Sequence, residues 1–391
     1  MGIVDRWLLP DGVEDMLPSQ AKRLEEVRRR LLDLFSTWGY DYVIPPMIEY
    51  LESLLTGTGR DLDLKTFKVV DFLTGRTMGV RADITPQVAR IDAHSLNSDG
   101  VARLCYAGTV VHAQADSMLA NRTPLSVGAE LFGDSTSKAD TEIVSLMVES
   151  LKSLGFDAVH VDLGNVDIFR QLMSGFALNT DQQELLFEAV QRKSIAEIGE
   201  RCEAFGLSEG DSLLLTQLPG LTGSNSVLER ARSLFKAHEG ILASIDNLQQ
   251  VSDTIAGRFT DLDVYFDLSE LRGYAYHTGM VFAAYVDASR SVVAKGGRYD
   301  HIGQVFGREA RGATGFSIDV RSLAEKVMLP EESRKCVWIA DVPPGEEGSL
   351  WQQIQQLRAE GYIVVESGQP DGFDHYLDFL NGQWQLVSGD K

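Results

Sequence analysis

The chain has 391 residues, of which 36 are basic and 57 acidic, so its formal net charge is −21. Its 44% apolar and 24% charged residues exclude a disordered or fibrous protein. The acidity argues against nucleic acid as the main partner, because such binding depends largely on contacts of Lys and Arg with phosphates. The sequence begins without the apolar core of a signal peptide and contains no apolar run of membrane-spanning length. We therefore expect a cytoplasmic protein that binds no membrane.

The first 165 residues predict helices and short strands in alternation. Residues 18–37 carry apolar side chains at spacings of three and four, which is typical of an amphipathic helix. A β-rich run at 40–44 ends at two prolines, which cannot continue a central strand. The other expected elements are a hairpin of 67–71 with 76–81, a helix from Thr85, a helix at 138–154, and strands at 104–112, 125–132 and 158–163.

The second half of the chain has a different pattern of apolar residues. Residues 168–258 show helical periodicity and predict a helical insertion, after which strands are expected at 264–267, 281–286 and 291–294. A linker at 330–334 precedes a strand, a helix and a strand at 337–340, 350–360 and 362–365, the order of a βαβ unit. We predict an α+β fold with a core at 1–325, a mainly helical insertion at 168–258, and a small C-terminal α/β domain at 331–391.

Four segments carry a family resemblance. They are Arg-Ala-Asp-Ile-Thr-Pro at 81–86, the strand pair from Tyr106 to Gly133, Leu-Arg-Gly-Tyr-Ala-Tyr-His-Thr-Gly-Met-Val-Phe at 271–282, and Gly-Gly-Arg-Tyr-Asp at 296–300. In this order they resemble the catalytic core of class II aminoacyl-tRNA synthetases, histidyl-tRNA synthetase in particular, over residues 8–325. The resemblance implies an antiparallel sheet flanked by helices.

The resemblance also implies a pocket for L-histidine. Asp83 and Thr85 match positions that hold the α-amino group, Glu130 matches the carboxylate that faces the imidazole, and Arg272 matches the arginine near the substrate carboxylate. The aromatic side chains that match the pocket lining are Tyr276, His277 and Tyr299. The set is chemically coherent, because acids suit an ammonium or an imidazole N–H and an arginine suits a carboxylate.

Two departures from the synthetase pattern affect ATP. His112 stands where the synthetases have the arginine that grips the α-phosphate, and a neutral imidazole lacks the charged fork of a guanidinium. Ser322 stands where they have the arginine that packs on adenine. Both ATP contacts are therefore expected to be lost, so that adenylation is absent, no residue of the chain is catalytic, and no metal or cofactor is required.

A retained amino-acid pocket without ATP contacts resembles the family of ATP phosphoribosyltransferase regulatory subunits. Residues 331–391 support this resemblance, because a segment with four basic and eleven acidic residues is a poor match for RNA. This resemblance implies a non-catalytic chain that activates a short-form catalytic subunit and relays feedback inhibition by L-histidine in the first step of histidine biosynthesis. It also implies a homodimer within a hetero-oligomer.

Two other functions stay open on the sequence alone. The chain could be an active synthetase paralogue that adenylates histidine or another amino acid, or a histidine-binding scaffold with no link to phosphoribosyl transfer. For the regulatory function, the segment between His112 and Leu125 is our candidate for the element that responds to histidine.

Overall fold

The structure is a computed structural model, and it describes residues 8–56, 60–97, 99–114, 121–287, 291–327, 335–339, 341–367 and 373–388. The contacts divide the chain into two compact units, residues 1–328 and 329–391. Among the described helices none is both long and apolar enough to cross a membrane. The expected linker at 330–334 and residues 115–120 of the candidate responding segment lie outside the described residues.

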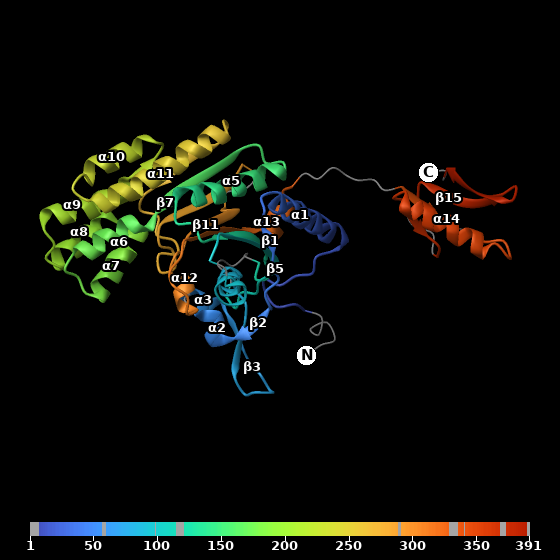
Figure 1. Cartoon of the computed structure of the whole chain (residues 1–391), viewed down its shortest axis with the longest axis horizontal. Coiled ribbons are helices and arrows are strands. Elements are labelled where there is room, and N and C mark those ends of the chain that lie inside the picture. The colour runs from blue at the N-terminus through green and yellow to red at the C-terminus, as the bar shows by residue number, and fades with distance from the viewer. Residues whose placement is uncertain are drawn as a thin grey trace. The chain divides into compact units, whose positions relative to one another are not determined.

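A nine-stranded sheet forms the centre of the larger unit, in the order β1-β5-β6-β12-β11-β10-β7-β9-β8 (Figure 1). Its neighbours pair antiparallel except for β1 with β5 and β7 with β9, so the expected antiparallel sheet is confirmed with two parallel pairs. The strands are β1 (Asp41–Tyr42), β5 (Ala102–Thr109), β6 (Leu125–Phe132), β7 (Val159–Asn165), β8 (Thr222–Gly223), β9 (Asp263–Asp267), β10 (Met280–Val286), β11 (Ala294–Arg298) and β12 (Ala313–Asp319).

The position of β11 corrects one prediction. The expected strand at 291–294 instead spans Ala294–Arg298 and includes two glycines. Gly296 pairs with Phe282 on one side and Phe316 on the other, and a Cβ at this position would collide with the Phe282 ring. Glycines are depleted in strands, so the usual β-propensity signal fails where a close approach requires them.

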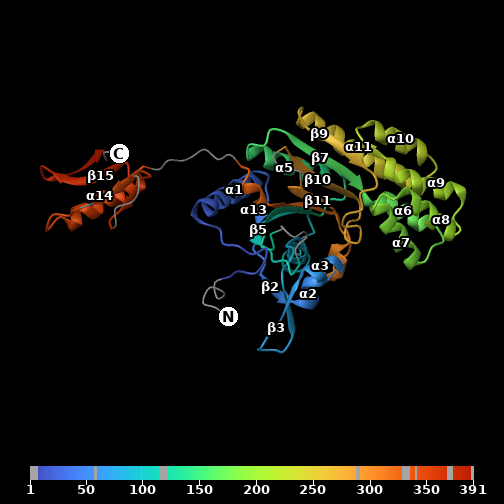
Figure 2. The ribbon, with the colours of Figure 1, turned by 180° about the vertical axis from the view of Figure 1, so that it is seen from behind.

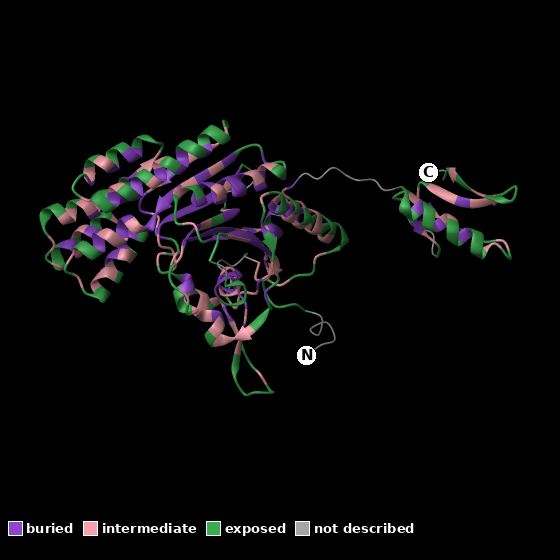
Figure 3. Cartoon of the chain, in the orientation of Figure 1, coloured by how far each residue is buried: buried purple, intermediate pink, exposed green. Residues whose placement is uncertain are grey.

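Long helices cover the sheet. Helix α1 (Pro18–Thr37) confirms the amphipathic prediction, since it buries Val27, Leu31 and Phe35 at a spacing of four. Helix α5 (Ser137–Ser153) packs against β12 and against helix α11 (Glu239–Arg258). Figure 3 shows the buried residues concentrated in the strands and on the inner side of these helices.

The helical insertion is also confirmed. It consists of α6 (Val166–Gly175), α7 (Thr180–Gln191), α8 (Ile195–Ala204), α9 (Glu209–Gln217), α10 (Ser226–Leu234) and α11, and it includes the short strand β8. Helices α6 to α10 lie together beside the end of the sheet, and α11 extends from them along the sheet (Figures 1 and 2). Strands β3 (Phe67–Val70) and β4 (Thr77–Val80) form the expected hairpin, and β4 also pairs with β2 (Ile48–Tyr50).

In its described residues the smaller unit is a four-stranded sheet in the order β14-β13-β15-β16 with one helix. Strand β13 (Cys336–Trp338), helix α14 (Glu347–Ala359) and strand β14 (Ile363–Val365) confirm the βαβ prediction, because the two strands pair parallel. The hairpin of β15 (His375–Leu380) with β16 (Gln383–Ser388) was not predicted. Its signal was the Asn381-Gly382 pair, whose positive φ angles of 54° and 80° suit a tight hairpin turn.

Candidate functional site

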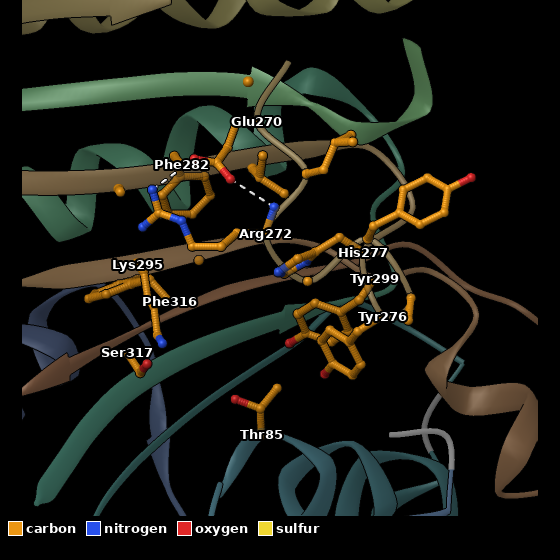
Figure 4. Close-up of a pocket in the computed structure, with 18 of the residues that line it drawn as sticks. Thr85, Glu270, Arg272, Tyr276, His277, Phe282, Lys295, Tyr299, Phe316 and Ser317 are labelled. Carbon is orange, nitrogen blue, oxygen red and sulfur yellow. Dashed lines mark hydrogen bonds and ion pairs between the residues drawn. The ribbon is translucent and has the colours of Figure 1, made fainter. Parts of the chain in front are cut away.

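A cavity of about 610 Å³ lies against the sheet of the larger unit, and all seven predicted pocket residues line it. Asp83 and Thr85 stand at the start of helix α4 (Thr85–Arg90), Glu130 on β6, and Tyr299 directly after β11. The remaining residues, Arg272, Tyr276 and His277, belong to the irregular loop 271–279 that precedes β10. Figure 4 shows the aromatic rings together, with Thr85 below them and Arg272 toward the other end of the cavity.

Glu130 is the polar centre of the pocket. Only 1% of the residue is exposed, and its carboxyl group accepts a 2.7 Å hydrogen bond from Thr85 Oγ1 and another from the Tyr299 hydroxyl. Gly315 pairs with Glu130 on the neighbouring strand, and a Cβ there would overlap the carboxylate. Asp83 accepts from the backbone N–H of Thr85 at 3.0 Å, which orients the start of helix α4 toward Glu130.

The aromatic side chains form one wall of the pocket. The rings of Tyr276 and Tyr299 stack with centroids 5.0 Å apart and planes at 28°, and His277 meets Tyr276 edge-on at 5.3 Å. The Tyr276 hydroxyl is buried and has no hydrogen-bond partner among the described residues. A buried unpaired hydroxyl is costly, so this atom is a ready contact for a polar ligand.

Burial sets the charge of the pocket. It raises the pKa of Glu130 to about 8, although the hydrogen bonds from Tyr299 and Thr85 oppose the rise. It lowers the pKa of His277 to about 4, so this imidazole is neutral near pH 7. Nδ1 of His277 lies 3.3 Å from the carbonyl oxygen of Arg298, a contact that favours the tautomer with a proton on Nδ1 and leaves Nε2 as an acceptor. Burial also raises the pKa of Tyr276 and Tyr299 well above the usual value, so both phenols stay protonated.

The end of the cavity near Arg272 carries charges of both signs, because Asp162, Asp267 and Glu270 line it together with basic side chains. The Arg272 side chain is 54% exposed and forms an ion pair with Glu270 at 2.7 Å, while Lys295 also lines the cavity (Figure 4). Phe282 and Phe316 add apolar surface near Arg272 and Lys295 (Figure 4). The cavity therefore offers an acid and hydroxyls at one end and guanidinium and ammonium groups among carboxylates at the other, which together provide partners for both charges of a small zwitterion.

Two residues that sequence reasoning did not assign hold this arrangement in place. Arg298 is 7% exposed and forms a buried ion pair with Asp140 at 3.0 Å, while its carbonyl accepts from the Thr278 N–H at 2.7 Å. Tyr106 is fully buried, with its hydroxyl 3.3 Å from Thr85 Oγ1. Both belong to the motifs that carry the family resemblance, so the motifs themselves were the available signal.

The two positions expected to have lost ATP contacts do not line the described part of the cavity. Nε2 of His112 lies 3.1 Å from the carbonyl oxygen of Ala82. Ser322 is exposed and donates to Asp319 at 2.5 Å. Its neighbour Arg321 is held elsewhere, since it donates to Thr123 Oγ1 at 2.9 Å and forms an ion pair with Glu14 at 3.2 Å.

In the described ranges, no group of three or more His, Cys, Asp or Glu side chains is arranged to hold a metal ion.

Comparisons with known proteins agree with the fold and the motifs. A family model for histidyl-tRNA synthetase matches residues 12–323, and a model for the C-terminal domain of the ATP phosphoribosyltransferase subunit HisZ matches residues 339–387. The ATP phosphoribosyltransferase regulatory subunit of Ectopseudomonas mendocina (strain ymp) is 48% identical, with 99% of each chain covered. That of Cellvibrio japonicus (strain Ueda107) is 46% identical, with 99% of this chain and 98% of the relative covered.

Two solved structures are similar to this chain in fold. An ATP phosphoribosyltransferase regulatory subunit/histidyl-tRNA synthetase from Bacillus halodurans matches with a TM-score of 0.79 at 27% identity, covering 92% of each chain. Histidyl-tRNA synthetase from Nostoc sp. PCC 7120 shares the fold, with a TM-score of 0.76 at 16% identity over 98% of this chain and 97% of that one. The chain thus belongs to the family of ATP phosphoribosyltransferase regulatory subunits, which share the histidyl-tRNA synthetase fold.

Proposed function

We propose that this chain activates a short-form ATP phosphoribosyltransferase catalytic subunit and mediates its feedback inhibition by L-histidine, in the first step of histidine biosynthesis. The observation that carries the proposal is the cavity that gathers Glu130, the unpaired Tyr276 hydroxyl and Arg272 in one site. The full-length relatives named as regulatory subunits support the link to that enzyme.

The cavity fits L-histidine group by group. Its α-amino group would bind beside Asp83 and Thr85, and its imidazole N–H beside the Glu130 carboxylate. Its carboxylate would bind toward Arg272, which is exposed enough to turn from Glu270 to a ligand. Tyr276, His277 and Tyr299 would enclose the ring by packing and hydrogen bonding.

We further propose that the chain does not adenylate amino acids. His112 replaces the phosphate-gripping arginine, and the nearby Arg321 is engaged with Glu14 and Thr123 away from the cavity. Loss of such a transition-state contact typically costs roughly 100-fold or more in rate. ATP and the phosphoribosyl donor would bind the catalytic subunit instead.

The assembly we propose is a homodimer of this chain within a cytoplasmic hetero-oligomer that contains the catalytic subunit. Nucleic acid is not among its partners, because the net charge of −21 repels phosphates on average. The homodimer follows from the class II core, whose dimers are usually built across the segment matched here by 19–48.

The decisive experiment mixes this chain with a short-form catalytic subunit and measures phosphoribosyl transfer with and without histidine. We expect the chain to raise the rate and histidine to lower it. An absence of both effects would reject the proposal. ATP–pyrophosphate exchange by the purified chain tests the active-synthetase alternative, and clear histidine-dependent exchange would establish it.

A further inference from the structure

Arg170, on helix α6 of the insertion, lies behind the loop that carries the pocket aromatics. Its Nη2 donates to the carbonyl oxygens of Tyr274 at 3.1 Å and His277 at 2.7 Å, and its Nη1 donates to that of Thr278 at 3.3 Å. The guanidinium also lies 5.0 Å from the centroid of the Tyr274 ring. One side chain thus fixes three peptide groups within residues 274–278.

The loop depends on such external support. It lacks regular secondary structure, and its turn requires Gly273, whose φ of 68° is unfavourable for other residues. The N–H groups of Tyr276 and His277 both donate to the Gly273 carbonyl at 2.8 Å, which places these two side chains in the cavity. The carbonyls that Arg170 binds are turned toward helix α6, so the helix determines where the loop backbone lies.

Other contacts tie the same loop to the insertion. The Tyr274 ring packs against Phe169 of α6 at 5.5 Å and Phe187 of α7 at 5.3 Å, and Phe187 itself lines the cavity. At the end of the loop, the first N–H of helix α6, from Val166, donates to the Gly279 carbonyl at 3.0 Å. The loop and the first two helices of the insertion therefore form one packed group.

We propose that Arg170 is a positioning residue for the ligand. By fixing the carbonyls of residues 274–278 it holds Tyr276 and His277 in the cavity, and it couples occupation of the cavity to the position of the helical insertion. The identity of the ligand as L-histidine rests on the proposed function. A lysine cannot replace the guanidinium fully, because a compact ammonium cannot reach three carbonyls in a planar fork.

The test compares Arg170→Met and Arg170→Lys with Arg232→Met. Arg232 is a matched control, because it is an insertion arginine with ion pairs to Glu229 and Asp246 and does not line the cavity. We expect Arg170→Met to weaken histidine binding about tenfold or more in calorimetry, Arg170→Lys to show an intermediate loss, and the control to keep wild-type affinity. Wild-type affinity in Arg170→Met would overturn the proposal.

Two further measurements exclude a merely structural effect. Millimolar methylguanidinium should restore affinity to Arg170→Ala and leave the wild type unchanged, and a lack of rescue in a folded Arg170→Ala would count against positioning by the guanidinium. Hydrogen exchange without ligand should be faster at the amides of His277 and Thr278 in Arg170→Met and unchanged in the Arg232 control. If the wild type binds no histidine, the proposed function fails. The hydrogen-exchange comparison still tests the role of Arg170 in that case, because unchanged exchange rates in Arg170→Met would overturn the proposal that Arg170 positions the loop.

Discussion

The buried carboxyl of Glu130 should make ligand binding depend on pH. Burial raises its pKa from 4.5 to about 8, so only about a tenth of the molecules carry the carboxylate at pH 7. An imidazole N–H or an ammonium binds a carboxylate better than a neutral carboxyl. Histidine should therefore lower the pKa of Glu130 and release a proton as it binds.

The magnitude follows from the ionised fraction. Forming the carboxylate at pH 7 costs about 1.4 kcal/mol, so the affinity should rise nearly tenfold between pH 7 and pH 9 through this group. Glu130→Gln cannot ionise, and it should lose both this pH dependence and a charge-assisted hydrogen bond, commonly ~1.5–3 kcal/mol. Calorimetry in two buffers with different protonation enthalpies counts the protons released. Free histidine titrates equally whether it is added to the wild type or to Glu130→Gln. The difference in the number of protons released by the two proteins is therefore due to Glu130.

Equal proton release and equal affinity in the wild type and Glu130→Gln would refute this reasoning and remove Glu130 from the ligand contacts. Folding offers an independent check of the raised pKa. Above about pH 4.5 the unfolded chain has lost this proton while the folded chain keeps it, so the free energy of unfolding should fall as pH rises toward 8. Denaturant titrations should show this fall reduced in Glu130→Gln.

Four other substitutions give separate expectations. Tyr276→Phe should keep or raise the stability of the ligand-free chain, because the hydroxyl is buried without a partner in the described structure, yet should weaken histidine binding several-fold in calorimetry. Gly315→Ala should destabilise by ~1–3 kcal/mol in denaturant unfolding because its methyl overlaps Glu130, whereas Gly199→Ala, on an open helix surface, should be neutral or stabilising. Arg298→Met should cost ~3–5 kcal/mol in the same assay by leaving a buried carboxylate unpaired, and a loss below 1 kcal/mol would contradict a structural role for that ion pair.

The motifs predicted which residues gather in the pocket, but not how they are held. Glu130 and Tyr299 are 169 positions apart, and only their family resemblance placed them together before the structure was known. Arg170 lies in a segment whose helical periodicity gave no reason to single it out, since its contacts are to backbone carbonyls, which every residue has. The unpaired state of the Tyr276 hydroxyl is likewise a property of packing, and no local pattern encodes it.

The construction of the pocket suggests how a ligand in it could act on a partner. Glu130 and Tyr299 lie on or beside strands of one hydrogen-bonded sheet, whereas loop 271–279 is fastened to the insertion by Arg170. A ligand that contacts both the sheet residues and loop 271–279 must bind with one free energy before the insertion shifts relative to the sheet and with another after it. A coupling of ~1–3 kcal/mol would change the affinity about 5- to 150-fold, and linkage makes the effect reciprocal. A catalytic partner that favours one position of the insertion would then alter histidine affinity by the same factor by which histidine alters the affinity for that partner.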